Sequence, residues 1–155
     1  MDMLSHALLT NLIFKDAPTG QRVWATIFSV LPDLLSFILL VFTDFFKKML
    51  FFKRPPASIY PPYVFKLYRV FHSLVLWSAV FLLLLVFGLE WWAIAFCGWG
   101  FHIVIDIFTH SKRAFPTQIL WPFSNYSFSG ISWSSKWFII INYSAILVLY
   151  IIFYF

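Results

Sequence analysis

Cysteine and charge are both scarce in this chain. Cys97 is the single cysteine, so an intrachain disulfide and a cysteine-rich metal site are both excluded. Charged residues make up 11% of the 155 residues, whereas soluble globular domains contain about 25%. Hydrophobic residues reach 62% and the mean hydropathy is +0.86. The composition therefore predicts an integral membrane protein with one all-α domain over residues 1–155.

Several signatures of enzymes and nucleic-acid binders are also missing. The chain has no Gly-x-Ser-x-Gly elbow, no phosphate-cradling glycine loop and no His-Glu-x-x-His. Serine and histidine are adjacent at three places, but neighbours on a helix face in different directions, so none of these pairs is a catalytic dyad. The net charge is +5, without a basic face interleaved with aromatics. We therefore expect contact with anionic lipid headgroups and no nucleic-acid partner.

Long apolar segments predict a helical bundle of four transmembrane helices and a shorter N-terminal helix. Residues 3–14 are apolar but span under about 20 Å, too little to cross a bilayer. No basic residue precedes this segment and no cleavage motif follows it, so we expect it to remain in the mature protein. The four predicted spans are Val23–Phe46, Leu67–Gly88, Ala93–His110 and Trp137–Phe155, with a tight turn at Leu89–Trp92 and a loop from Lys47 to Pro62.

Basic residues predict the orientation of these spans. The loop at 47–69 carries six Lys or Arg and the loop at 111–136 carries three, whereas the opposite side has only Lys15 and Arg22. Four spans place both long loops on one side, and an excess of basic residues marks the cytoplasmic side. We therefore expect both loops to be cytoplasmic.

The third span contains three side chains that can bind metal. His102, Asp106 and His110 follow one another at i, i+4 and i+8, which places them within roughly 80° of arc on one helix face. Ionisable residues are costly in lipid and are kept there mainly for a task. We interpret this face as one wall of a metal site.

Three further residues can converge on that wall. His72 opens the second span on the side where His110 ends the third. A hairpin about Pro18 would bring His6 and Asp33 to similar depth. Imidazole and carboxylate ligands suit zinc ahead of manganese or iron. The metal-ligand candidates are His6, Asp33, His72, His102, Asp106 and His110, enough for one complete site or for two metals with bridging carboxylates.

Other roles remain open for individual residues. Asp33 or Asp106 can serve as the catalytic general base or orient a ligating histidine. Ser73 and Thr109 are candidates for hydrogen bonds to bound water or substrate, and Arg69 can either clamp a phosphate or anchor its span at the headgroups. A histidine at the end of a span can also be a simple hydrogen-bonding residue at the interface.

These motifs resemble the family of membrane-bound metal-dependent hydrolases that includes the LexA-regulated inner-membrane proteins. The family is itself distantly similar to zinc-dependent phospholipase C. The matching segments, in order, are Ser5-His6, Leu31-Pro32-Asp33, Phe71-His72-Ser73-Leu74, His102-x-x-x-Asp106-x-x-Thr109-His110 and Trp121-Pro122-Phe123-Ser124. Many relatives have a second Asp where Leu35 stands and an extra His where Tyr68 stands. Both departures lower the number of possible metal ligands, and they therefore weaken the case for a two-metal site.

The resemblance implies a metal-dependent hydrolase in a bacterial inner membrane. Its substrate is expected to be a phosphoester or a lipid close to the cytoplasmic face, attacked by a metal-activated water. One alternative is a non-catalytic metal-binding protein, either an ion carrier or a metal-stapled scaffold. Another is a structural bundle in which the histidines bind no metal.

Overall fold

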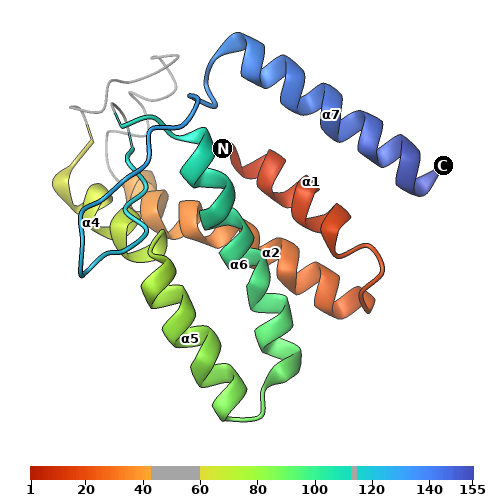
Figure 1. The fold of residues 1–155 in the computed structure, drawn as a ribbon, viewed down its shortest axis with the longest axis horizontal. Coiled ribbons are helices and arrows are strands. Elements are labelled where there is room, and N and C mark those ends of the chain that lie inside the picture. Colours follow the sequence, from red (N-terminus) through yellow and green to blue (C-terminus); the bar gives the residue numbers. More distant parts are fainter. Residues whose placement is uncertain (43–59, 113–114) are drawn as a thin grey trace.

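The computed structural model describes residues 1–42, 60–112 and 115–155, and these residues form helices joined by loops, with no strand among them (Figure 1). The all-α prediction is therefore confirmed. In chain order, the elements are α1 (Met3–Ile13), α2 (Thr19–Phe37), the 3-10 helix η1 (Ile38–Phe42), α4 (Pro62–Phe71), α5 (Leu74–Val86), α6 (Glu90–Thr109) and α7 (Lys136–Tyr154).

Within residues 1–42, 60–112 and 115–155, three segments are long and apolar enough to cross a membrane: Thr19–Leu40, Glu90–Thr109 and Lys136–Tyr154. A fourth span forms if α4 and α5 are counted together, although they are bent by 46°. α1 is apolar but shorter, as the sequence predicted. The composition and these lengths together identify a membrane protein.

The predicted second span, Leu67–Gly88, is broken rather than continuous. α4 ends at Phe71, and α5 starts anew at Leu74 because the Ser73 side chain accepts a hydrogen bond from the Leu76 backbone N–H. The predicted end of the loop at Pro62 was also wrong, since Pro62 is the first residue of α4. Proline suits that position because its missing N–H has no helical partner there.

Two other predicted boundaries shift. α2 begins at Thr19, earlier than the predicted Val23, and the predicted end at Phe46 lies outside the described residues. The expected turn at Leu89–Trp92 is shorter, because α6 already starts at Glu90. Gly88, at φ 69°, ends α5, with Leu89 N–H bonded to Leu84 O and Gly88 N–H to Leu85 O. This pattern is a Schellman cap, which turns the chain within two residues.

Small residues set the packing of the bundle. α2 and α6 cross at its centre, with α1 beside them and α7 outermost, packed on α1 (Figure 1). At the crossing a Cβ atom on Gly98 would lie 2.1 Å from the Ala25 carbonyl oxygen. Only glycine allows the two backbones to approach so closely, as is common between membrane helices. This crossing fixes the position of α2 relative to the chemistry on α6.

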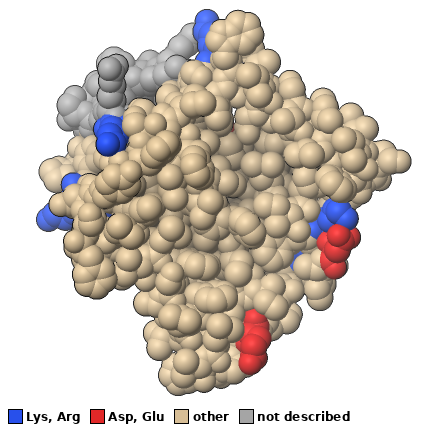
Figure 2. Space-filling model, viewed as in Figure 1, with Lys and Arg blue, Asp and Glu red and all other residues tan. Residues whose placement is uncertain are grey.

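The surface is apolar and the interior is unusually polar. Figure 2 shows a face broken by few charged side chains, most of the visible basic ones on its upper left and the acidic ones low and on the right. Of α7, only Ile146 is buried, and α5 has no buried residue. The buried face of α2, in contrast, includes Gln21, Ser29, Asp33 and Ser36. This inverted pattern suits a bundle surrounded by lipid.

Candidate metal centre

The six predicted metal ligands lie together in the interior of the bundle. Each element contributes at a defined point: α1, α2, the break between α4 and α5, α6 twice, and the residue that follows α6. His72 lies in the break between α4 and α5, and its side chain points into the interior of the bundle. In chain order the residues are His6, Asp33, His72, His102, Asp106 and His110, and all six are buried.

Four of the six residues form a compact group that could hold a metal ion. One ligand atom each from Asp33, His72, His102 and Asp106 lies within 4.8 Å of the others. His72 Nε2 is 3.4 Å from both Asp33 Oδ1 and Asp106 Oδ2. His102 Nε2 is 3.3 Å from Asp106 Oδ2 and 3.8 Å from Asp33 Oδ1. The two Nε2 atoms are 3.0 Å apart.

These separations match the edges of a tetrahedral metal site. With zinc–ligand bonds of about 2.0–2.2 Å, neighbouring ligand atoms in a tetrahedron are about 3.3–3.6 Å apart. The five distances given above, from 3.0 to 3.8 Å, scatter around that value. A set of two imidazoles and two carboxylates fits a divalent cation.

Backbone carbonyls fix the tautomer of both central histidines. His102 Nδ1 lies 2.7 Å from Ser29 O, and His72 Nδ1 lies 2.9 Å from Tyr68 O. Because a carbonyl only accepts hydrogen bonds, each Nδ1 carries the proton and each neutral ring keeps a lone pair on Nε2. The two lone pairs and the carboxylate oxygens thus face one another, an arrangement that a cation would stabilise.

His6 and His110 approach the opposite side of Asp106. His6 Nε2 lies 3.0 Å from Asp106 Oδ1, and His110 Nδ1 lies 3.3 Å from the same oxygen. The His6 ring also stacks on His102, with 3.8 Å between centroids. The amino group of Met1 also contacts Oδ1. The predicted convergence of the six side chains is therefore confirmed, whereas ligation by His6 and His110 stays a prediction.

A loop covers this centre from the side where α6 ends. Thr117 is buried; its hydroxyl lies 3.1 Å from Tyr68 Oη and 3.4 Å from the Asp106 carbonyl. Farther along, Gly130, Ile131 and Trp133 donate their N–H groups to the carbonyls of His110, Phe108 and Thr109. These bonds satisfy the end of α6, whose last carbonyls have no helical partners. The loop is therefore fixed to the helix that carries the centre.

The predicted substrate-binding residues differ in their surroundings. Thr109 is buried and its hydroxyl donates to Asp106 Oδ1 at 3.3 Å. The Ser73 hydroxyl is engaged twice, as the cap of α5 and as a donor to Trp121 O. Arg69 is exposed in the last turn of α4. Their roles towards a substrate stay predictions.

Three supporting residues were not found by sequence reasoning. Tyr68 stacks on His72, with 3.7 Å between centroids and 20° between planes, and supplies the carbonyl that holds its Nδ1. Ser29 does the same for His102 through its own carbonyl. Tyr68 precedes His72 by four residues and Ser29 precedes Asp33 by four, so helical spacing could have found both. Nothing in the sequence points to Thr117.

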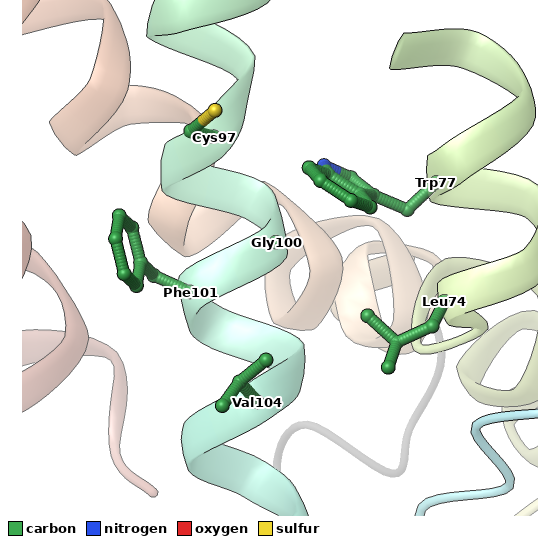
Figure 3. Close-up of a pocket in the computed structure, with 6 residues that line it drawn as sticks. All are labelled: Leu74, Trp77, Cys97, Gly100, Phe101 and Val104. Carbon is green, nitrogen blue, oxygen red and sulfur yellow. The ribbon is translucent and has the colours of Figure 1, made fainter. Parts of the chain in front are cut away.

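The surface hollow of about 190 Å³ between α5 and α6 does not belong to this centre. Figure 3 shows Leu74 and Trp77 on one side and Cys97, Phe101 and Val104 on the other. Its α6 residues project from the face opposite to His102 and Asp106, because residues two positions apart point about 200° apart on a helix. The lining is entirely apolar and suits contact with lipid.

Comparisons of the chain with protein-family models, with curated proteins and with solved structures find no match.

Proposed function

We propose that the protein is a membrane-embedded metal-dependent hydrolase that cleaves a phosphoester of a lipid or lipid-like substrate. The observation that carries this proposal is the group of four metal-capable side chains, within 4.8 Å of one another, buried in an otherwise apolar bundle. A purely structural role would favour hydrogen-bonded pairs. Two imidazole lone pairs that face each other at 3.0 Å favour a cation instead.

The residues around the centre would have different roles in such a reaction. A divalent cation, zinc ahead of manganese or iron, would supply Lewis acidity and, where its shell expands to a fifth ligand, a water of lowered pKa. Asp33, His72, His102 and Asp106 would hold it. His6 and His110 face the other oxygen of the Asp106 carboxylate, at 3.0 and 3.3 Å. Asp33, slightly exposed at 8%, is the carboxylate of the group that an incoming water can reach.

The surroundings of the centre favour a lipid substrate. The outer surface of the described residues is apolar, so an amphiphile within the membrane can approach the bundle where a soluble metabolite would be excluded. Arg69 and Lys112 lie close in sequence to His72 and His110 and supply positive charge for a phosphate, whereas Arg113 lies outside the described residues. Together with the resemblance in sequence, this supports a reaction near the cytoplasmic face of a bacterial inner membrane as part of the proposal.

Metal content tests the proposal first. Detergent-purified protein should hold near-stoichiometric metal, and His102→Ala and Asp106→Ala should both lose it. Asp16→Ala is a matched control, because Asp16 is an exposed carboxylate that pairs with the neighbouring Lys15. The metal-loaded protein should then release phosphate or headgroup from phospholipids or generic phosphoesters. Absence of metal after reconstitution would sink the proposal, and a loaded protein inert towards all these substrates would restrict it to metal binding.

A metal-ion carrier is the second candidate, and the buried polar face of α2 favours it. Gln21, Ser29 and Asp33 share that face and could line a path away from the centre. The path is blocked at Ala25, where α6 approaches so closely that only Gly98 fits. Uptake of zinc or manganese into proteoliposomes would support the carrier, and retention of tightly bound metal without uptake would support the hydrolase.

A further inference from the structure

The two oxygens of Asp106 face different sets of histidines. Oδ2 points to His72 and His102, at 3.4 and 3.3 Å from their Nε2 atoms, and makes no hydrogen bond within the described part of the chain. Oδ1 points the other way, 3.0 Å from His6 Nε2 and 3.3 Å from His110 Nδ1. The second pair of distances is of the same size as those in the four-residue group. Asp106 thus lies between two clusters, both built from imidazoles.

The histidines of the second cluster have no other hydrogen-bond task. Nδ1 of His6 and Nδ1 of His110 are both buried without a hydrogen-bond partner among the residues that the structure describes. This differs from His72 and His102, whose second nitrogens are tied to carbonyls. A buried polar atom without a partner costs about 1–3 kcal/mol. At His110 the unpartnered Nδ1 is the atom that faces Oδ1, so a cation bound there would compensate that cost. His6 would reach the same cation through Nε2, the atom that lies 3.0 Å from Oδ1. The Met1 amino group and the Thr109 hydroxyl, which also contact Oδ1, show that this oxygen attracts positive or donating groups.

We infer that Asp106 bridges two cation sites, the four-residue site and a second one formed by Asp106 Oδ1, His6 and His110. The inference rests on the proposed function, because the four-residue site is the metal centre proposed there. The second site has three protein ligands, one fewer than the first. Three protein ligands leave a position open for a water or for a substrate oxygen. The second cation is therefore the one that would receive the phosphoester oxygen, and the one that exchanges more easily.

Metal stoichiometry and spectroscopy test this inference without an activity assay. Protein loaded with Mn²⁺ should bind about two ions per chain, and two ions bridged by a carboxylate, about 3.5–4 Å apart, should give an exchange-coupled EPR spectrum. His6→Gln and His110→Gln should each bind about one ion and show the spectrum of an isolated ion, since each removes one of three ligands. Thr10→Val is the matched control, because Thr10 is buried one turn from His6 on the same helix and its hydroxyl also has no partner. Circular dichroism and gel filtration of every variant confirm folding.

The possible outcomes separate this inference from the proposed function. A single ion in the wild type, kept by both glutamine variants, would overturn the second site even if the protein hydrolyses phosphoesters. Loss of all metal in folded His6→Gln or His110→Gln would also overturn it, since one shared centre would then include these residues. Two ions in a protein inert towards every phosphoester would leave the second site standing and sink the hydrolase.

Discussion

His72 and His102 face each other through their Nε2 atoms at 3.0 Å, while each ring bonds a backbone carbonyl through its Nδ1 atom. Both rings were expected as metal ligands from their positions in the sequence. The structure adds the reason for their orientation, because each carbonyl holds the proton on the outer nitrogen and leaves the inner nitrogen free to bind. The carboxylates of Asp33 and Asp106 then enclose, together with the two inner nitrogens, a space bordered by hydrogen-bond acceptors.

Asp33→Asn should weaken metal binding while preserving the fold. The amide has the shape of the carboxylate but not its charge, and Asp33 is one of only two carboxylates in the four-residue group. We expect at least a tenfold loss of metal affinity, which lowers the stabilisation by saturating metal by about 1.4 kcal/mol. The rise in Tm when zinc replaces chelator should shrink accordingly. Asp16→Asn, at an exposed carboxylate, should keep the full rise. An unchanged rise in Asp33→Asn would exclude Asp33 as a ligand.

Tyr68 should matter more through its ring than through its hydroxyl. Tyr68→Phe keeps the stacking on His72 and loses the hydrogen bond to Thr117, so stability should fall by about 1 kcal/mol with little change in metal affinity. Tyr68→Ala also removes the surface against which the imidazole is held, and metal affinity should fall by about 10–100-fold. Isothermal titration with zinc measures both. Equal affinities in the two variants would show that the ring does not position His72.

Helical spacing in the sequence was enough to predict much of this centre, whereas the rest depends on tertiary contacts that the sequence does not reveal. His102, Asp106 and His110 were readable as one face because they lie in or directly after a single helix. His6 was harder to place, because its position depends on how α1 turns back on α2. The break at Ser73 was missed, since the segment around it is apolar on both sides and a single serine seldom ends a span. Thr117 could not have been predicted, because its loop has no periodicity and is held by carbonyls of α6.

Gly98→Ala should disturb the metal centre from a distance. A methyl group there would meet the backbone of Ala25, which cannot move aside as a flexible side chain can. Overpacking of this kind costs about 1–3 kcal/mol or more, and it would shift Asp33 on α2 away from His102 on α6. We expect lower Tm and weaker metal binding. Gly20→Ala is the control in α2, since its new methyl would lie 3.5 Å from Trp91, an ordinary contact. A Gly98→Ala variant as stable as Gly20→Ala would contradict the observed helix crossing.

Gly130→Ala should loosen the loop that covers the centre. Its methyl group would lie 2.1 Å from the Phe108 carbonyl oxygen, at the point where the loop bonds the end of α6. The amides of Gly130, Ile131 and Trp133 are expected to exchange slowly in the wild type and at least tenfold faster in the variant, because their carbonyl partners separate. Hydrogen exchange followed by mass spectrometry measures this. Protection of the loop amides that is unaffected by the substitution would show that the contact with α6 does not hold the loop.

Asp2 should link stability to pH where α1 meets α7. Burial raises the pKa of Asp2, but hydrogen bonds from Ser5 and Tyr143 outweigh burial and hold the pKa below its usual value. A carboxyl whose pKa is lower in the folded state stabilises the protein above its unfolded pKa, and this contribution is lost as the pH falls through the folded pKa. Acidification from neutral pH to below about pH 4 should therefore lower the Tm of the wild type more than that of Asp2→Asn.

Tyr143→Phe tests the cause of that difference. It removes one of the hydrogen bonds that lower the pKa of Asp2 and leaves the carboxylate in place. The pH dependence of its Tm should therefore lie between those of the wild type and Asp2→Asn. The buried carboxyls Asp33 and Asp106 are present in all three proteins, so only the differences between the curves report on Asp2. Parallel curves for the wild type and Asp2→Asn would show that Asp2 does not join α1 to α7 through its charge, and the bond between Asn142 and Ser5 would then carry that contact.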